Sequence, residues 1–382
     1  MKKKIMHVAQ SAGGVSRYLK SFLKYSDKNK YEIILVVSKD YLNELCDFKD
    51  LADIIKVVHM ERNIKFKNDL LCIYEVYKLY RDFLPDIVYC HSSKAGAITR
   101  LALMFSRVPI VYNAHGWAFN MKAPKLKLKI YSLIERFLAL RTNLIINISD
   151  YEQITAQKQK IKCNMKRIYN GIDLNEESEF QESIDLRENL KINKTSKIIG
   201  VVGRLSKQKS PFTFVKVAER LANQDQNTHF LWVGDGEQRE EIENLVDSIP
   251  ALRSRFTITG WVNDPISYIK LFDIALLLSK WEGFGLVLTE YMSLRKPIVA
   301  TNIDAIPEIV TNNECGFLVN VDSIEEFCDS ITQLLSNDEL VEKFITNGYL
   351  KVNEVFNIKR VVEEHEIIFS EILSNKESIC KS

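Results

Sequence analysis

Short apolar runs alternate with helical patterns along the first half of the chain. Five runs have the length of a strand, and between them apolar residues recur at helical spacing. The predicted strands are 5–9, 32–37, 86–90, 109–112 and 143–148, and the predicted helices are 16–25, 69–83, 94–105 and 126–140. Because strands that alternate with helices form parallel sheets covered on both faces, this half predicts a doubly wound α/β domain. Ligands of such sheets bind beyond the C-terminal strand ends.

The same alternation begins again in the second half. Its predicted strands are 197–203, 229–233, 256–259, 273–278, 297–301 and 316–319, with a helix over 212–221 and a final helix over 355–373. The polar, acid-rich stretch 175–194 has little core potential and predicts a linker. A chain of 382 residues is also long for one core, so we expect two domains, 1–169 and 170–356.

Composition narrows the class of protein. With 46% hydrophobic and 27% charged residues the chain is globular, and a net charge of +2 argues against a general nucleic-acid binder. The seven cysteines are scattered, which predicts reduced thiols in a cytosolic protein without a zinc site or disulfides. The basic N-terminus leads into a strand and not a signal peptide. No run approaches the roughly 20 apolar residues that cross a bilayer.

The stretch 281–292 joins a predicted strand to a helix and carries two carboxylates. Gly283 and Gly285 fall at the turn, where glycine lets the N–H groups of a helix start approach an anion. Glu282 lies at the mouth of this turn and Glu290 within the helix, and carboxylates only accept hydrogen bonds. The pattern suggests a ligand with a central phosphate and hydroxyls at both ends, such as a nucleotide sugar. The alternative is a plain strand–loop–helix connection with surface glutamates.

Glu282, then Gly-Phe-Gly, then Glu290 resembles the signature of retaining glycosyltransferases of the GT4 family. The resemblance implies the GT-B fold, in which two Rossmann-like doubly wound domains face each other across a cleft. The N-terminal domain would bind the acceptor and the C-terminal domain the donor, with a helix over about 357–382 packing back on the first domain. Glu290 would bind the donor ribose and Glu282 the donor sugar. The diphosphate would lie on the backbone of four residues: Phe284, Gly285, Leu286 and Val287.

Two cations follow the first strand of the second half. Arg204, directly after Gly203, and Lys209 flank a loop at the strand end and can clamp one phosphate pair. A basic surface turn is the alternative. Gly-Arg-Leu with a lysine five residues after the arginine closely resembles the GT4 phosphate clamp. In that family the region after strand 256–259 cradles the base with main-chain groups, which assigns Val262 to the nucleotide.

Two loops of the first half are further candidates. Gly13 and Gly14 follow the first strand, where a tight turn without ligand is the simpler interpretation. The loop resembles that of GT4 enzymes, in which a Gly-Gly pair after the first strand approaches the donor diphosphate. His115 follows the strand 109–112. A single histidine is more often structural, but the family places a histidine here that reaches the donor sugar, and His115 matches it.

The segment 121–141 is the most basic of the chain. Its cations are Lys122, Lys125, Lys127, Lys129, Arg136 and Arg141, against one acid, Glu135. On a helical projection Lys122, Lys125, Lys129 and Arg136 share one side, beside Leu126, Ile130, Leu133 and Phe137. The segment is either a domain helix with a solvated charged face or a helix on an anionic membrane surface. GT4 enzymes that act on lipid-linked acceptors often carry such a helix, which implies a cytoplasmic enzyme at the inner face of the membrane.

One stretch departs from the family. The family has a glycine-rich turn before Pro-Glu, whereas Asp304 and Ala305 stand before Pro307 and Glu308 here. This leaves open which donor sugar is accepted.

These features lead us to expect a retaining, metal-independent glycosyltransferase without cofactor. Arg204, Lys209 and the helix start at Gly285 would stabilise the charge that grows on the departing diphosphate. There is no Asp-x-Asp pair for a metal. The resemblance suggests a UDP-activated hexose or N-acetylhexosamine and an undecaprenyl-diphosphate-linked acceptor in capsule or exopolysaccharide synthesis. The alternatives are a GT-B nucleotide-sugar epimerase and a non-catalytic subunit of a polysaccharide assembly complex.

Overall fold

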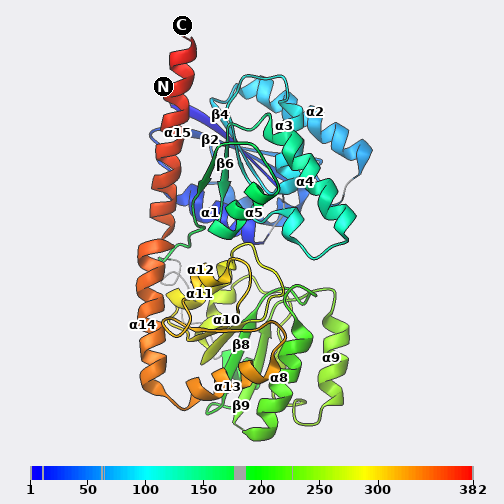
Figure 1. Cartoon of the computed structure of the whole chain (residues 1–382), viewed down its shortest axis with the longest axis vertical. Helices are drawn as coiled ribbons and strands as arrows, with labels where there is room; N and C mark the ends of the chain where they lie inside the picture. Colours follow the sequence, from blue (N-terminus) through cyan, green and yellow to red (C-terminus); the bar gives the residue numbers. More distant parts are fainter. Residues whose placement is uncertain are drawn as a thin grey trace. The chain divides into compact units, whose positions relative to one another are not determined.

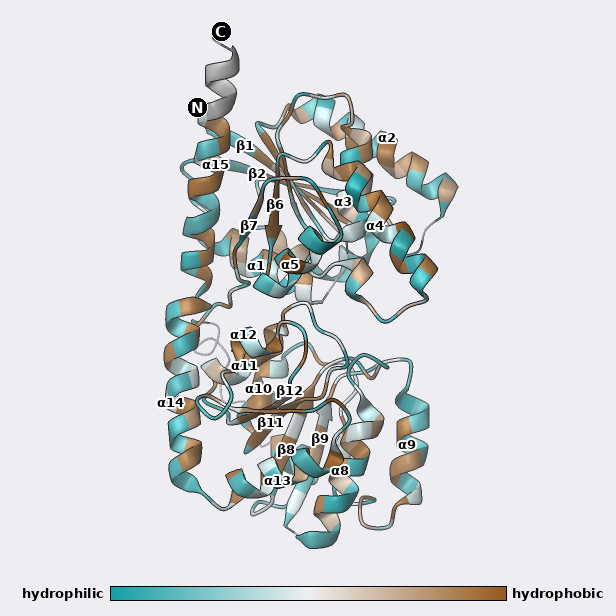
Figure 2. Ribbon diagram, in the orientation of Figure 1, coloured by the Kyte–Doolittle hydropathy of each residue, from teal (hydrophilic) through white to brown (hydrophobic). Residues whose placement is uncertain are grey.

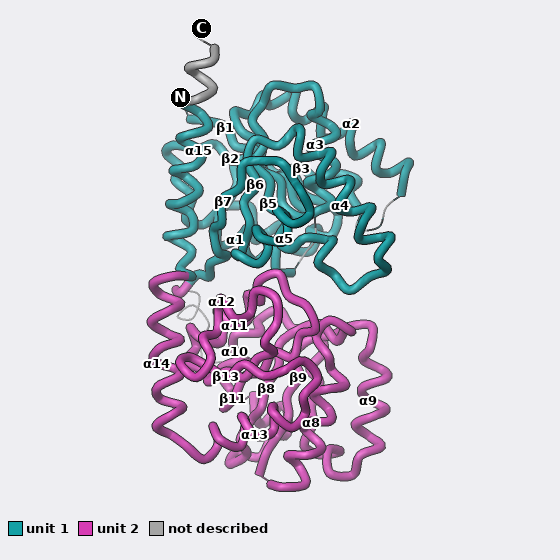
Figure 3. Tube along the Cα trace, viewed as in Figure 1, with its two compact units in different colours: residues 1–173, 356–382 teal, residues 174–355 magenta. Residues whose placement is uncertain are grey.

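The computed structural model describes residues 2–10, 13–61, 63, 65–175, 186–225 and 227–380, with side chains as far as 374. The chain forms two compact units (Figure 3). Unit 1 comprises Met1–Asp173 and Phe356–Ser382, and unit 2 comprises Leu174–Val355. The boundaries predicted from the sequence lie after residues 169 and 356, whereas those of the two units lie after residues 173 and 355. The last helix therefore belongs to unit 1, although it follows unit 2 in the chain.

Unit 1 is built on a parallel sheet covered by helices (Figure 1). The sheet has seven strands in the order β3-β2-β1-β4-β5-β6-β7. Its strands are β1 (Lys3–Ala9), β2 (Tyr31–Ser38), β3 (Ile54–Val58), β4 (Ile87–His91), β5 (Ile110–Asn113), β6 (Leu144–Asn147) and β7 (Met165–Arg167). Its helices are α1 (Gly14–Tyr25), η1 (Lys39–Phe48), α2 (Phe66–Phe83), α3 (Ser93–Ala102), η2 (Ala118–Asn120), α4 (Lys125–Ala139), α5 (Asp150–Lys158) and α15 (Ile358–Cys380).

The two faces of this sheet bury separate apolar clusters. Side chains alternate along a strand, so Ile5 and Ala9 of β1 pack with α1 and α15, whereas Met6 and Val8 pack with α2 and α3. His7 therefore lies on the same face as Ile5, against α1. Both faces are covered, which explains why the central strands read as nearly continuous apolar runs.

Unit 2 has a six-stranded parallel sheet with the order β10-β9-β8-β11-β12-β13. Its strands are β8 (Lys197–Val202), β9 (Thr228–Val233), β10 (Phe256–Ile258), β11 (Ile274–Leu277), β12 (Ile298–Thr301) and β13 (Phe317–Val319). Its helices are α7 (Leu186–Asn189), α8 (Pro211–Gln224), α9 (Arg239–Ser248), α10 (Pro265–Lys270), α11 (Leu286–Ser293), α12 (Ile306–Ile309), α13 (Ile324–Leu335) and α14 (Asp338–Val355).

Each sheet has one point where the strand order reverses. In unit 1 this point lies between β1 and β4, and in unit 2 between β8 and β11. Ligands of doubly wound sheets bind beside such a point, outside the C-terminal strand ends. The loops after these four strands carry most of the candidate residues.

Two strands were not predicted from the sequence. β3 and β7 are short and only partly buried, and β7 contains the charged Lys166 and Arg167. Both lie at the edges of the sheet of unit 1. An edge strand is exposed to solvent and therefore lacks the continuous apolar run that marks a buried strand.

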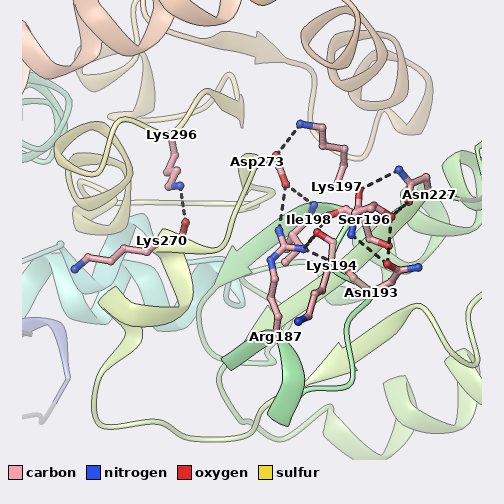
Figure 4. A network of polar contacts seen from close by, with 11 residues as sticks. Arg187, Asn193, Lys194, Ser196, Lys197, Ile198, Asn227, Lys270, Asp273 and Lys296 are labelled. Atoms are coloured by element: carbon pink, nitrogen blue, oxygen red, sulfur yellow. Dashed lines mark hydrogen bonds and ion pairs between the residues drawn. The ribbon is translucent and has the colours of Figure 1, made fainter. Parts of the chain in front are cut away.

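The later part of the predicted linker is anchored to unit 2 (Figure 4). Arg187 donates hydrogen bonds to the carbonyl oxygens of Asn193 and Ser196, both at 3.1 Å, and Ile192 is buried. Asp273 pairs with Lys197 at 3.1 Å and accepts the N–H of Ile198 at 2.8 Å. These contacts lie at the strand ends opposite to the candidate site. The earlier part, 176–185, lies outside the described residues.

Within the described ranges, no helix combines the length and the apolar character needed to cross a membrane.

Candidate active site

The start of α11 is shaped by Gly285. This residue has a φ of 89° and a ψ of 55°, in the left-handed region that glycine adopts most readily. A Cβ atom there would lie 3.3 Å from Leu288 Cδ1 and 3.4 Å from Glu282 Cγ. No side chain among the described residues caps the helix, so the N–H groups of Leu286 and Val287 point from an uncapped helix start. This geometry is suited to an anion.

The two motifs of unit 2 meet at Glu282. Lys209 Nζ lies 2.7 Å from Glu282 Oε2, and Ser279 Oγ donates to the same oxygen at 3.0 Å. The side chains of Lys209 and Glu282 are only 17% and 13% exposed. They are 73 positions apart in sequence and come together because β8 and β11 are neighbours in the sheet. The structure thus joins the predicted phosphate clamp to the carboxylate assigned to the sugar.

Asp304 holds the backbone of Glu282. Its Oδ2 accepts the N–H of Glu282 at 2.9 Å, and its φ is 50°. Asp304 therefore adopts the left-handed conformation that glycine favours, at a position where the family has a glycine-rich turn. Its carboxylate also makes a contact that glycine cannot make. Sequence reasoning missed this role, because a side chain bonding to a backbone 22 residues away leaves no local pattern.

Arg204 lies at the end of β8 and pairs with Glu237 at 2.9 Å. Both side chains are 55% exposed. An ion pair this exposed contributes only about 0–1 kcal/mol, so Arg204 can exchange Glu237 for a ligand at small cost.

The loop that carries Arg204 rests on two glycines. A Cβ on Gly234 would lie 2.2 Å from the Gly203 oxygen, and one on Gly236 would lie 2.3 Å from the Leu205 oxygen. Trp232 Nε1 also donates to the Gly203 oxygen at 2.8 Å. Any larger residue at Gly234 or Gly236 would displace the loop. The sequence shows this glycine pair after a strand but not its purpose.

The remaining nucleotide candidates of unit 2 lie on the same edge. Glu290, in the second turn of α11, is 5% exposed. The next residue, Tyr291, accepts the N–H of Val202 at 2.8 Å and ties α11 to β8. Val262 is half-buried and follows the bridge between Gly234 and Gly260. The assignments of Glu290 to the ribose and of Val262 to the base stay predictions.

Gly13 and Gly14 begin α1 in unit 1. Gly13 has a φ of 90°, and a Cβ atom on either glycine would have no neighbour within 4 Å among the described residues. This open space is compatible with a ligand beside the loop, and the diphosphate role of the pair stays a prediction. Ser11 and Ala12 of the same loop lie outside the described residues.

His115 ends a row of three imidazoles. Its Nε2 lies 3.1 Å from His91 Nδ1, and His91 Nε2 lies 3.1 Å from His7 Nδ1. Burial, reinforced by the nearby His365, lowers the pKa of His7 and of His115 to about 3. Burial and the adjacent imidazoles hold the pKa of His91 well below its usual value. Sequence reasoning identified His115 alone. His7 and His91 lie inside apolar strands, where a histidine is easily taken as an ordinary core residue.

The basic segment is arranged differently from its helical projection. Glu135, its one acid, is buried and paired with the buried Arg100 at 2.8 Å. Arg136 donates to the Gln159 oxygen at 2.5 Å, and Arg141 donates to the Leu103 oxygen at 2.7 Å. Both arginines are therefore used within unit 1. The surface keeps four lysines: Lys122, Lys125, Lys127 and Lys129.

Hydrophobic and hydrophilic residues alternate along α4 (Figure 2). All four apolar side chains of the predicted stripe are exposed, namely Leu126 (72%), Ile130 (47%), Leu133 (50%) and Phe137 (55%). The predicted apolar stripe therefore exists, but it faces away from the core of the unit. Phe105, just beyond α3, is 99% exposed. Contiguous apolar surface of this kind marks interaction sites.

No group of three or more histidine, cysteine or acidic side chains in the described ranges is arranged to hold a metal ion. The six cysteines whose side chains are described there are free.

Two family models match almost consecutive parts of the chain. The model described as Glycosyltransferase Family 4 matches residues 12–176, and the model described as Glycosyl transferases group 1 matches residues 182–351. An Escherichia coli relative, a UDP-Gal:alpha-D-GlcNAc-diphosphoundecaprenol alpha-1,3-galactosyltransferase, is 29% identical over 82% of this chain and 83% of its own. The capsular polysaccharide biosynthesis glycosyltransferase CapM of Staphylococcus aureus is 25% identical over 98% and 99%.

Solved structures share the fold over nearly the whole chain. The crystal structure of Anabaena HepE in complex with UDP and glucose superimposes with a TM-score of 0.82 at 20% identity, covering 96% of this chain and 99% of HepE. A glycosyltransferase from Rickettsia africae gives a TM-score of 0.79 at 22% identity, covering 98% and 99%. The two matched family models show that the chain belongs to the GT4 glycosyltransferases, and the structural likenesses, together with the two parallel sheets, show the GT-B fold.

Proposed function

We propose that this glycosyltransferase is retaining and metal-independent. It moves a hexose or N-acetylhexosamine from a UDP-sugar to an undecaprenyl-diphosphate-linked glycan in capsule or exopolysaccharide synthesis. The observation that carries the proposal is the partly buried Lys209–Glu282 pair beside the uncapped start of α11. It puts a cation, a carboxylate and free helix N–H groups at one strand edge, as a sugar diphosphate requires.

The cations of unit 2 supply the leaving-group chemistry. Negative charge grows on the diphosphate as the sugar leaves, so Lys209, Arg204 and the α11 start stabilise the transition state more than the ground state. They occupy the role that a divalent metal takes in other transferases. Lys209 exchanges part of its bond to Glu282 for the phosphate, which leaves the carboxylate free to accept a sugar hydroxyl.

The remaining contacts follow the family resemblance. Glu290 binds the ribose hydroxyls and Val262 the base, while Gly13 and Gly14 approach the diphosphate from unit 1. His115 reaches the donor sugar. No carboxylate stands out as a nucleophile, and attack of the acceptor on the same face from which the diphosphate leaves accounts for retention.

The donor and the acceptor class are inferred from relatives. The E. coli relative is named for UDP-galactose and for a diphosphoundecaprenol-linked GlcNAc, and HepE was crystallised with UDP. A lipid-linked acceptor also explains the surface of α4. Four lysines beside an exposed apolar stripe suit an anionic bilayer, so we infer that the enzyme lies peripherally at the cytoplasmic face of the membrane.

Product analysis tests the activity. Purified enzyme with UDP-galactose should release UDP only when a polyprenyl-diphosphate-linked acceptor is added, and the α-anomer should form. Free UDP without acceptor, or an epimerised donor, would point to the epimerase alternative. The rate should be the same with and without EDTA, and restoration by Mg²⁺ of a lost rate would contradict the metal-independent mechanism.

A further inference from the structure

His7, His91 and His115 of unit 1 form a continuous row of hydrogen-bonded imidazoles. His7 stands on β1, His91 ends β4 and His115 follows β5, so neighbouring strands hold the rings side by side. The rings of His7 and His91 are stacked with centroids 5.4 Å apart, and those of His91 and His115 with centroids 5.3 Å apart. Each link joins an Nδ1 atom to an Nε2 atom at 3.1 Å.

The row holds a fixed number of protons. Because the pKa of each ring is lowered far below neutrality by burial, all three rings are neutral at physiological pH and each carries one N–H. Two of these three N–H groups lie in the two links. The third must lie at one end, on His7 Nε2 or on His115 Nδ1, and its place fixes the tautomer of every ring.

The two ends have different surroundings. His7 Nε2 is buried and has no hydrogen-bond partner in the described part of the chain. His115 is half-buried, and its Nδ1 is not among the buried side-chain atoms that lack a hydrogen-bond partner in the described part of the chain. An orphaned buried N–H is rarer in proteins than an under-used acceptor. The third proton therefore belongs on His115 Nδ1, with His7 donating to His91 and His91 donating to His115.

A second set of bonds fixes the orientation of the His115 backbone. Asn113 Oδ1 accepts the N–H of His115 at 2.8 Å, and Asn113 Nδ2 donates to Tyr89 at 3.4 Å. His365 donates through Nδ1 to the Val361 oxygen at 2.7 Å, so its Nε2 accepts the Tyr89 hydroxyl at 3.0 Å. These bonds help to hold His115 at its left-handed φ of 51°. With its backbone held in this way, the imidazole ring of His115 can keep one orientation.

We propose that His7 and His91 are positioning residues that lock His115 as its Nδ1–H tautomer. This rests on the proposed function, in which His115 reaches the donor sugar. His115 then presents a neutral N–H donor to an oxygen of the sugar, and it cannot act as a base at Nδ1. Neither His7 nor His91 touches the substrate in this scheme.

The tautomer can be observed directly. The chain has six histidines, so ¹⁵N-histidine labelling of the full-length protein gives few signals, and long-range ¹H–¹⁵N correlation identifies the protonated nitrogen of each ring. At pH 7.5 we expect His115 to be protonated at Nδ1. Protonation at Nε2 would overturn the proposal, whatever the activity.

Variants test the link to turnover. His7→Leu removes the first donor, so we expect His115 to become a mixture of tautomers and kcat to fall about tenfold, the loss of one hydrogen bond. KM for the donor and UDP affinity should not change. His7→Asn keeps an N–H near the position of Nδ1 and should restore most of the rate. His59→Gln, at an exposed histidine of the same unit, should match wild type.

The outcomes separate the two proposals. A protein with the Nδ1–H tautomer but no transferase activity would refute the proposed function alone. If the wild type is active and His7→Leu changes neither the His115 tautomer nor kcat, the proposed positioning role of His7 and His91 is refuted. If His7→Leu does not fold, the wild-type spectrum and the His7→Asn rate decide the question.

Discussion

The ligand edges of the two sheets carry different chemistry, although both sheets are parallel and doubly wound. In unit 2 the edge bears full charges: Lys209 with Glu282, and Arg204 with Glu237. In unit 1 it bears neutral aromatic rings, with His7 and His91 buried and His115 half-buried beside Tyr18 and Tyr89. In the proposed function, the cations of unit 2 serve the diphosphate, whereas the neutral His115 of unit 1 and the carboxylate of Glu282 in unit 2 serve the sugar.

The two units should also respond differently to salt and to pH. Charged pairs near solvent weaken with salt, whereas buried neutral histidines are sensitive to acid. Unit 2 should therefore change with ionic strength and unit 1 with pH.

Acidification should have the largest effect. The pKa of His7 and of His115 is lowered to about 3 and that of His365 to about 4, chiefly by burial. Below pH 6.5 the unfolded chain binds protons that the native unit does not, so the unfolding free energy falls as the pH falls towards these values. The slope is at most about 1.4 kcal/mol per pH unit for each histidine, against a total stability of about 5–15 kcal/mol.

Pulse proteolysis in urea at pH 7.5 and pH 5, with fragments assigned by mass spectrometry, measures this. Unit 1 should open at lower urea at pH 5. Unit 2 has one comparable histidine, His229, with a pKa lowered to about 4 by burial. If unit 2 were cleaved at a lower urea concentration than unit 1 at pH 5, the expected greater acid sensitivity of unit 1 would be contradicted.

The two glutamates of unit 2 should separate turnover from affinity. Glu282→Ala removes the carboxylate assigned to the sugar, and we expect kcat to fall about 100-fold or more, the loss typical of a preorganised polar group. UDP affinity should hold or rise, because Lys209 is released from its partner. Glu290→Ala should instead weaken UDP binding. The exposed Glu243→Gln serves as control, and equal effects of both variants on UDP binding would refute the division.

The phosphate clamp should show a smaller effect, in affinity. Lys209→Ala and Arg204→Ala each remove a charge-assisted bond worth about 1.5–3 kcal/mol. The loss should be larger for Lys209, which is 17% exposed, than for Arg204, which is 55% exposed. Calorimetry with UDP at low and high salt measures both. Lys216→Ala, at an exposed lysine of α8, is the control, and unchanged affinity in both clamp variants would exclude the clamp.

Replacement of the α4 lysines, which tests the proposed membrane contact of unit 1, should show the smallest effect per residue. Each lysine near an anionic bilayer contributes about 1 kcal/mol. Replacing Lys122, Lys125 and Lys129 with Glu should abolish sedimentation with anionic vesicles at low salt and leave UDP binding intact. High salt should release the wild type.

A matched control exists in the same unit. Lys158, Lys160 and Lys162 are also exposed, and their replacement with Glu should not release the protein. If the α4 variant sediments like wild type, the exposed apolar stripe serves another purpose.

The sequence predicted most of the fold because its information is local. Buried strands such as β1, β4, β8 and β11 appear as short apolar runs, and their predicted bounds lie close to those of the structure. Edge strands escaped because exposure removes that pattern. The exposed apolar stripe of α4 was visible for the same local reason, whereas the burial of Glu135 under Arg100 was not.

Sequence alone determined the parallel α/β architecture, the two carboxylates around Gly-Phe-Gly, and the cations of the clamp, since each is written in adjacent residues. Tertiary structure decided that Lys209 pairs with Glu282, that Asp304 holds the Glu282 backbone, and that three histidines form one row. These contacts join positions from different strands and loops. Spacing along the chain cannot encode them, because the order of strands in the sheet, and not their order in the sequence, sets which side chains meet.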